Sequence, residues 1–295
     1  MSTHEYNRSS SCKPICPTLN YELPIDPTLN QIIKLIKNFV PHEPTSECSF
    51  RQFTDGLTNR LFKIAYDAGT SKVQVLIRIY GEKTELLIDR EKELRSMLAL
   101  HKKGLAPPVY GKFLNGVCYG YIAGKPFSAL DIVDPTKSTL VAQHLARFHA
   151  TEVPDIPTSP SLFDTLSKWQ KQVPESGDIH RVVNIKDGDY TDDFFCKEVA
   201  WLKNKMKSFR EWKVAFCHND LLAGNIIFKE DKVDFIDYEY GSYNYVLFDI
   251  GNHMCEAMGV DVNLSVSFLY EQTYNMFLEK NQPFFYHSFF QQNIL

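Results

Sequence analysis

Apolar residues recur at different spacings along the chain, and each spacing predicts a different kind of element. In residues 29–40 they repeat every three or four positions, which predicts an amphipathic helix that ends before Pro41. The segments on either side of residues 54–59 predict two strands joined by a turn, and residues 73–80 predict a third strand. The first part of the chain is therefore expected to form a sheet preceded by one helix.

Helical spacing dominates further along. Helices are predicted at about 85–103, with Gly104 as the stop, at 140–150 and at 194–209. Asn115-Gly116 predicts a β-hairpin whose second strand, 117–122, leads into a hinge. Residues 178–193 are expected to be exposed and variable in structure. The pattern predicts an α+β chain with three parts: a flexible tail (1–27), a small β-rich N-lobe (28–123) and a larger, mostly helical C-lobe (124–295).

Composition narrows the class of protein. The net charge of −4 argues against a nucleic-acid partner, and no apolar run is long enough to span a membrane. The polar N-terminus does not look like a secretory signal. Seven cysteines without a C-x-x-C pair indicate reduced thiols inside a cell, so a cytoplasmic protein is expected.

The stretch 214–256 carries the chemistry. After an apolar run it places His218, Asp220 and Asn225 in an H-x-D-x-x-x-x-N frame, and a second apolar run ends at Asp237. This is the order of parts in a kinase catalytic loop. We interpret Asp220 as the general base, Asn225 and Asp237 as Mg²⁺ ligands, and His218 as a residue that orients the loop.

This stretch also allows two other interpretations. The Asp and Asn could be surface residues that fall into the frame by coincidence. A zinc site built from cysteine and histidine could also be imagined, but its spacing matches no standard pattern, and free cysteine is commonly buried in cores; the residues concerned are Cys217, His218, His253 and Cys255.

The N-lobe offers candidates for nucleotide binding. The turn around Gly56 is either a plain hairpin or a flap whose N–H groups cover ATP phosphates. Arg78, in the third strand, is either a phosphate contact or a solvent-facing residue. Glu91 or Glu93 could pair with Arg78, and Glu91 is preferred because it shares a helix face with Leu94 and Leu98.

The segments FCHNDLLAGNIIF and VDFIDYEYGSYNYVLFDIGNHMCE resemble the choline/ethanolamine kinase family. VLIRIYG and TDGLTN are similar to the family's N-lobe strand and phosphate loop, which adds Thr58 and Asn59 to the expected phosphate contacts. HNDLL, FIDYEY and RIYGEKTELLIDRE look closer to ethanolamine kinases than to choline kinases.

The resemblance implies a bilobal, protein-kinase-like fold that uses ATP and Mg²⁺ to phosphorylate an amino alcohol. The expected reaction is the first step of the CDP-ethanolamine route to phosphatidylethanolamine. By position, Glu256 would lie near the substrate amine. Tyr240 and Tyr243 either wall the same pocket or pack in the core. Some members of the family form homodimers.

The sequence departs from the family near its end. It stops at PFFYHSFFQQNIL and has no Trp after Trp212, whereas the resemblance implies a Trp-rich segment that closes the amine pocket. Three further readings therefore stay open: a choline kinase, a shortened inactive variant that binds a full-length enzyme, and a kinase of other hydroxylated amines such as aminoglycosides. The Y-N-Y-x-x-F-D-I-G-N-H run argues against the last.

Overall fold

The computed structural model describes residues 16–40, 47–53, 59–81, 88–171, 192–207 and 212–255, without the side chains of 170 and 192–195. They form two compact units. The first falls within residues 1–84 and 107–122, and the second within residues 85–106 and 123–295. The helix that follows the third predicted strand groups with the second unit.

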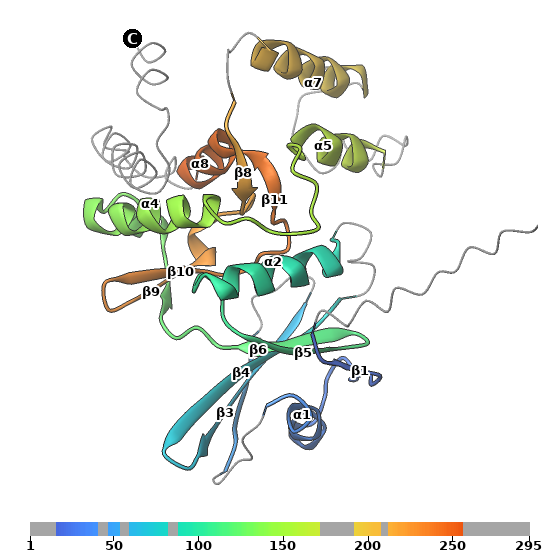
Figure 1. Cartoon of the computed structure of the whole chain (residues 1–295), viewed down its shortest axis with the longest axis vertical. Coiled ribbons are helices and arrows are strands. Elements are labelled where there is room, and N and C mark those ends of the chain that lie inside the picture. Colours follow the sequence, from blue (N-terminus) through green and yellow to red (C-terminus); the bar gives the residue numbers. More distant parts are fainter. Residues whose placement is uncertain are drawn as a thin grey trace, which may run out of the picture. The chain divides into compact units, whose positions relative to one another are not determined.

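The first unit contains a six-stranded sheet with the order β1-β5-β6-β4-β3-β2 (Figure 1). The predicted strands and hairpin are present. Neighbouring strands are antiparallel except β1, which pairs in parallel with β5. The strands are β1 (Thr18–Leu19), β2 (Ser49–Phe53), β3 (Arg60–Ala68), β4 (Ser71–Ile79), β5 (Val109–Phe113) and β6 (Gly116–Gly120).

The predicted first helix is α1 (Leu29–Ile36), which starts at a capping box formed by Thr28 and Gln31. It ends four residues earlier than predicted because the Asn38 side chain donates to the carbonyls of Lys34 and Leu35. The apolar face of α1 packs with the sheet in one core, which includes Ile32, Leu35, Ile36, Phe62, Ile64, Val75, Ile77 and Ile79.

The expectation of a flexible tail to residue 27 is wrong for residues 16–27. Cys16 is buried, β1 pairs with β5, and Leu23 is part of the core. The Asn115 side chain also binds both the N–H and the carbonyl of Leu23. These long-range contacts hold a segment whose polar composition alone predicts disorder.

The hairpin predicted around Asn115-Gly116 is confirmed, with its loop at 114–115 because Gly116 already pairs with Phe113. A Cβ at Gly116 would lie 2.2 Å from the carbonyl oxygen of Arg78 and 2.3 Å from the Phe113 ring. Only glycine lets β6 approach β4 this closely.

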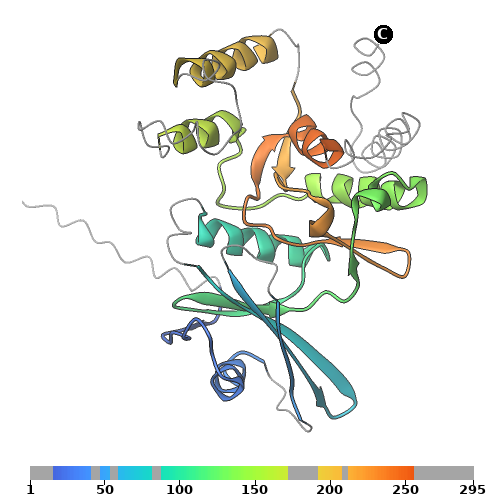
Figure 2. The same cartoon turned by 180° about the vertical axis from the view of Figure 1, so that it is seen from behind.

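The second unit is mostly helical and contains two small sheets, β10-β9-β7 and β11-β8, drawn largely in orange in Figure 2. Its helices are α2 (Arg90–Lys102), α3 (Ala129–Ile132), α4 (Pro135–His149), α5 (Leu162–Gln170), α7 (Asp192–Lys207) and α8 (Val246–Cys255), with a 3-10 turn η2 (Ala223–Asn225). Its strands are β7 (Lys125–Pro126), β8 (Val214–Cys217), β9 (Ile226–Lys229), β10 (Lys232–Phe235) and β11 (Ser242–Tyr245).

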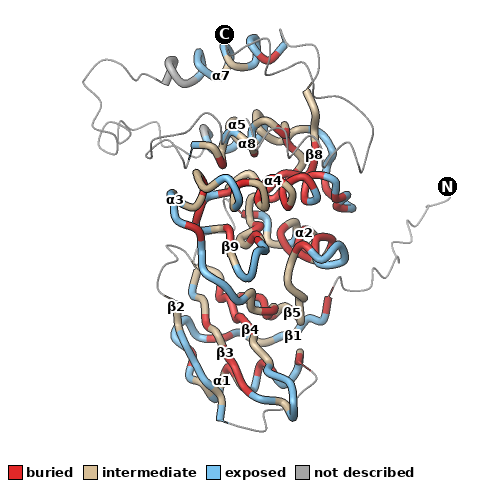
Figure 3. The backbone as a smooth tube through the Cα atoms, turned by 90° about the vertical axis from the view of Figure 1, so that its left-hand side faces the viewer, coloured by how far each residue is buried: buried red, intermediate tan, exposed pale blue. Residues whose placement is uncertain are grey.

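The predicted helices correspond to α2, α4 and α7. Gly104, at φ +69°, ends α2 as expected, whereas residues 82–87 lie outside the described part. Helix α4 starts earlier than predicted because Pro135 occupies its first turn and Asp134 caps it. Figure 3 shows α4 largely buried and the described part of α7 mostly exposed.

Within the described ranges, no helix is both long and apolar enough to cross a membrane.

Candidate active site

Two antiparallel strand pairs hold the candidate catalytic stretch. Strand β8 leads into His218 and pairs with β11, while β9 and β10 form a hairpin in which Ile226 lies opposite Phe235. At the open end of that hairpin, the N–H of Ile236 donates to the carbonyl of Asn225 at 2.9 Å. Asn225 and the residue after Ile236, Asp237, therefore lie at the same end of the hairpin, as the sequence predicted.

Asp220 and Asn225 are in direct contact. The Asn225 Nδ2 group donates to the Asp220 carbonyl at 2.9 Å and reaches its Oδ2 at 3.4 Å. These bonds use only the amide nitrogen of Asn225, whereas Mg²⁺ binds the amide oxygen. The contact thus fixes Asn225 beside Asp220 in a way that is compatible with metal binding.

Asp237 shares its surroundings with Asp220. Its backbone adopts φ +66°, a left-handed conformation that is uncommon outside glycine and most tolerated by Asn and Asp. Burial raises the pKa of Tyr240, and the charges of Glu239, Asp220 and Asp237 raise it further, while Arg90 lowers it. The charges of three carboxylates therefore reach one ring, and carboxylate oxygens are the kind of ligand that a divalent cation prefers.

His218 is fully buried behind the loop. Its Nε2 lies 2.9 Å from the carbonyl oxygen of Ile236, which can only accept, so Nε2 carries the hydrogen. This bond ties the loop before Asp220 to the segment before Asp237. The geometry supports the predicted orienting role of His218.

Helix α8 holds the backbone of the loop. The Asp249 carboxylate accepts from the N–H groups of His218 at 2.8 Å and Asn219 at 2.7 Å. Asn252 Oδ1 accepts from the N–H of Leu221 at 2.7 Å, and His253 Nδ1 lies 3.1 Å from the Leu221 carbonyl.

Sequence reasoning used the F-D-I-G-N-H run only as a family signature and missed these three functional side chains. Their spacing of three and four positions on one helix was the available signal, because such residues share a face.

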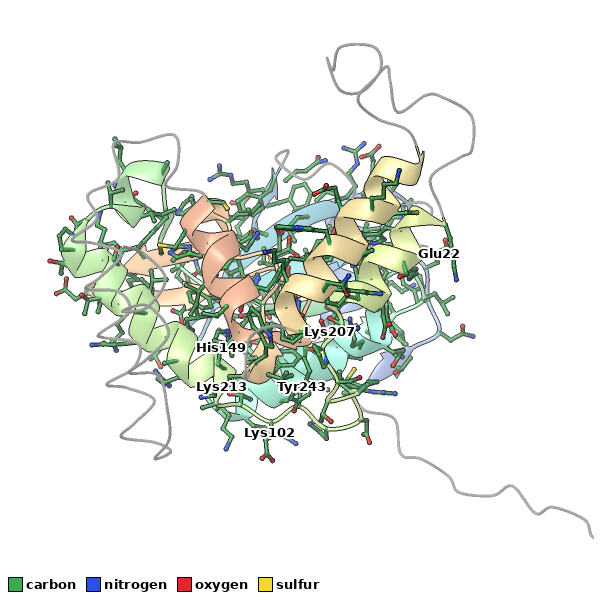
Figure 4. The ribbon with its side chains drawn as sticks, turned by 90° about the horizontal axis from the view of Figure 1, so that it is seen from above. Glu22, Lys102, His149, Lys207, Lys213 and Tyr243 are labelled. Atoms are coloured by element: carbon green, nitrogen blue, oxygen red, sulfur yellow. The ribbon has the colours of Figure 1, made fainter. Side chains whose placement is uncertain are left out.

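Asp249 also binds His149, at the end of α4 and labelled in Figure 4, with its Nε2 at 2.9 Å. Burial alone would raise the pKa of Asp249. The bond and charge of His149, together with His218, instead hold that pKa below its ordinary value. Asp249 is thus a buried carboxylate that accepts three hydrogen bonds.

The four residues of the imagined zinc site are not grouped as metal ligands. Among the described residues, the metal-ligating atoms that gather belong instead to His149, Cys217 and Asp249, all buried. Burial raises the pKa of the Cys217 thiol, which donates to the Asn244 carbonyl at 3.5 Å. A protonated thiol is a poor zinc ligand, so these residues form a hydrogen-bonded core.

In the first unit, Arg78 is only 6% exposed, so the solvent-facing alternative is wrong. Its guanidinium lies 5.8 Å from the ring centroids of both Tyr80 and Tyr119. Asn59 Oδ1 accepts from the N–H of Gly81 at 3.4 Å. Gly56 and Thr58 lie outside the described residues.

The packing reason for preferring Glu91 is wrong. Glu91 is exposed, whereas Glu93 is 1% exposed and pairs with Arg90 at 3.0 Å. Arg90 also binds Glu239 at 3.3 Å, so it joins the start of α2 to the segment after Asp237. The pairing of Arg78 with a glutamate of this helix stays a prediction.

The two candidate pocket tyrosines differ. The Tyr243 hydroxyl accepts from the N–H of Val153 at 3.1 Å, and its ring packs against Phe216, which favours the core-packing alternative. Tyr240 lies among the carboxylates described above. Glu256 and the chain after it, where the departure from the family was seen, lie outside the described residues.

Comparisons with known proteins show which family the chain belongs to. A family model for choline/ethanolamine kinases matches residues 50–293. The chain is 36% identical to a probable ethanolamine kinase of Nematostella vectensis, over 83% of this chain and 71% of that protein. It is 38% identical to ethanolamine kinase 1 of Mus musculus, over 79% and 65%, and 37% identical to the Homo sapiens protein, over 79% and 52%. The chain thus spans between about half and 71% of these relatives.

Solved structures share the fold. An ethanolamine kinase of Plasmodium vivax superposes with a TM-score of 0.66 at 24% identity, covering 80% of this chain and 72% of that one. A choline kinase of Cryptosporidium parvum gives 0.71 at 20% identity, covering 86% and 80%. The predicted α+β, protein-kinase-like fold and the resemblance seen in the sequence are confirmed: this chain belongs to the choline/ethanolamine kinase family.

Proposed function

We propose that this chain transfers the γ-phosphoryl group of ATP to the hydroxyl of ethanolamine and forms phosphoethanolamine, the first step of the CDP-ethanolamine route to phosphatidylethanolamine. The observation that carries the proposal is the convergence of Asp220, Asn225 and Asp237 at one end of the β9–β10 hairpin. The relatives named ethanolamine kinase support the choice of substrate.

Each residue has a role in this scheme. Asp220 accepts the proton of the substrate hydroxyl as its oxygen attacks the γ-phosphorus and ADP departs. Asn225 and Asp237 offer the oxygen atoms that hold Mg²⁺, which neutralises charge on the phosphates when bound. Arg78, Asn59, Gly56 and Thr58 are the residues expected to contact the phosphates, and the pairing of Arg78 with Glu91 stays part of the proposal although its packing reason is wrong.

The amine end of the substrate is expected to face Glu256 and the acidic surroundings of Tyr240. A primary ammonium has three donors that carboxylates can accept, whereas a quaternary ammonium relies on aromatic faces. Choline phosphorylation is the second candidate function, because Tyr240 offers such a face and solved choline kinases share the fold. A cytoplasmic location and a homodimer, expected from the sequence, remain proposals.

Release of ADP by the purified chain with MgATP tests the proposal. Turnover with ethanolamine well above choline is expected. Turnover with choline but not with ethanolamine would show that choline, and not ethanolamine, is the substrate. Absence of turnover with both, from a chain that binds MgATP, would instead favour a role as a binding partner.

Asp220→Ala should lower kcat by about 100-fold or more and leave ATP binding largely unchanged, because the variant removes the group that accepts the proton. Steady-state rates and nucleotide titration measure the two effects. Asn219→Ala is not a suitable control, because the Asn219 side chain holds the same loop. Asp134→Asn changes a residue at the start of α4 and should keep normal turnover. Near-normal turnover by Asp220→Ala would contradict the assignment.

A further inference from the structure

Trp169 is a large aromatic side chain that packs beside the candidate active site and that no step above uses. It lies near the end of α5 and is 39% exposed. Its ring centroid is 6.3 Å from that of Tyr240, with the ring planes at 87°.

Two contacts fix α5 relative to this site. The N–H of Ser161 donates to the carbonyl of Tyr243 at 2.9 Å, and the Ser161 and Ser242 hydroxyl groups are 2.8 Å apart. The residue that begins α5 is thus bound to β11, two and three residues after Tyr240. The position of Trp169 is set by the same backbone that positions Tyr240.

Tyr240 in turn belongs to the candidate active site. Its carbonyl accepts from Asn219 Nδ2 at 3.0 Å, and Asn219 directly precedes Asp220. The charges of Asp220 and Asp237 both act on its ring. Trp169 and Tyr240 therefore form two aromatic rings at about right angles beside an acidic site.

We infer that Trp169 forms an aromatic wall of the amine subsite and sets how well that subsite takes a quaternary ammonium relative to a primary one. This inference rests on the proposed function, since it places the amine beside Tyr240. Aromatic faces attract cations within about 6 Å. A quaternary ammonium has no N–H group to donate, so it depends on such faces more than ethanolamine does.

The kinetic test compares Trp169→Ala, Trp169→Phe and wild type. Trp169→Ala should raise the KM for ethanolamine by about threefold and the inhibition constant of choline by about tenfold or more, with the KM for ATP unchanged. Trp169→Phe keeps an aromatic face and should lie close to wild type. Equal effects on both amines, or none, would overturn the inference.

Trp201→Ala is a matched control. Trp201 is 56% exposed on α7, where Lys205 lies 5.8 Å from its ring, and it has no part in the contacts of Tyr240 given above. Its removal should change neither amine constant. A change as large as that of Trp169→Ala would show a general loss of tryptophan packing and would overturn the inference.

A binding measurement separates this inference from the proposed function. Choline titrated without ATP should change tryptophan fluorescence in wild type and in Trp201→Phe, but not in Trp169→Phe. A fluorescence change that depends on Trp169, in a chain without turnover, would support the inferred role of Trp169 and refute the proposed activity. A signal that persists in Trp169→Phe, or is absent in wild type, would overturn the inference even if the kinase is active.

Discussion

At the scale of single residues, Asp249 holds the backbone of the candidate catalytic loop. It accepts from the backbone N–H groups of His218 and Asn219 and from His149, and the bonds from His218 and His149 are fully buried. Asp249→Asn keeps the size but replaces one acceptor oxygen by a donor, so it leaves a buried N–H without an acceptor. We expect a loss of about 3 kcal/mol in the free energy of unfolding, measured by urea denaturation.

Asp134→Asn is the matched control for Asp249→Asn. Asp134 also accepts from backbone N–H groups, those of Thr136 and Lys137, but it does so at an exposed helix start. Asn caps helices about as well as Asp, so this variant should be close to wild type. Equal losses from both substitutions would refute a special role for Asp249.

His144 makes the folded state sensitive to acid. Burial lowers its pKa to about 3, helped by the charges of Arg147 and His218. An unfolded histidine titrates near 6.5, so between these two pH values the unfolded chain binds a proton that the folded chain does not. Stability is therefore expected to fall as the pH is lowered from about 6.5 towards 3, by about 2 kcal/mol at pH 5 from this group.

His144→Leu should remove that part of the pH dependence. Unfolding free energies at pH 7 and pH 5 measure it. His101→Leu, at an exposed position on α2, should keep the dependence of the wild type. A His144→Leu chain that loses as much stability at pH 5 as wild type would rule out this histidine as the cause.

At the scale of elements, Arg90 joins helix α2 to the segment after β10. It binds Glu93 on its own helix and Glu239, and the three side chains are 13%, 2% and 11% exposed. Arg90→Gln removes the positive partner of two nearly buried carboxylates. We expect it to lower the free energy of unfolding by about 2 to 3 kcal/mol, measured by urea denaturation.

Two further variants make the Arg90 prediction specific. Arg95→Gln, on the same helix, loses only an exposed bond to the Asp155 carbonyl and should cost less than about 1 kcal/mol. Arg90→Lys should recover part of the loss, because a lysine keeps the positive charge but cannot place its ammonium where the guanidinium holds Nη1, which contacts both carboxylates. An unchanged free energy of unfolding in Arg90→Gln would show that the ion pairs of Arg90 with Glu93 and Glu239 do not stabilise the fold.

At the scale of the whole molecule, ligand binding should stabilise the folded chain and raise its Tm. A ligand at 100 times its dissociation constant stabilises the folded chain by about 2.7 kcal/mol. MgATP is therefore expected to raise the Tm by about 5 °C or more, and removal of Mg²⁺ with a chelator should reverse most of the shift. Thermal unfolding followed by circular dichroism measures it.

Asp237→Ala should lose the Mg²⁺-dependent part of this shift, whereas Asp234→Ala, three residues earlier on β10, should keep it. If the Tm shift of Asp237→Ala still depends on Mg²⁺, Asp237 is not a Mg²⁺ ligand. Equal loss in both variants would point to damage to the hairpin.

Much of the fold could be predicted because apolar spacing, helix-ending residues and turn residues all favour the elements that form. Helix α1 follows its apolar spacing, Gly104 ends α2, and the β5–β6 hairpin forms around Asn115. The convergence of Asp220, Asn225 and Asp237 also follows from sequence, since a two-strand hairpin leaves its ends together.

Long-range contacts decided what the sequence left open. Polar composition predicted a tail to residue 27, but pairing of β1 with β5 and burial of Leu23 order residues 16–27. Helical spacing allowed Glu91 or Glu93 to face inward, and packing buried Glu93.

The sequence by itself determined the family and the order of the candidate catalytic groups, because those depend on residue identity and spacing. Tertiary structure alone assigned Asp249, Asn252 and His253 to the loop backbone and placed Trp169 against Tyr240. These contacts join residues 30 to 71 positions apart, and no local pattern encodes which donor meets which acceptor.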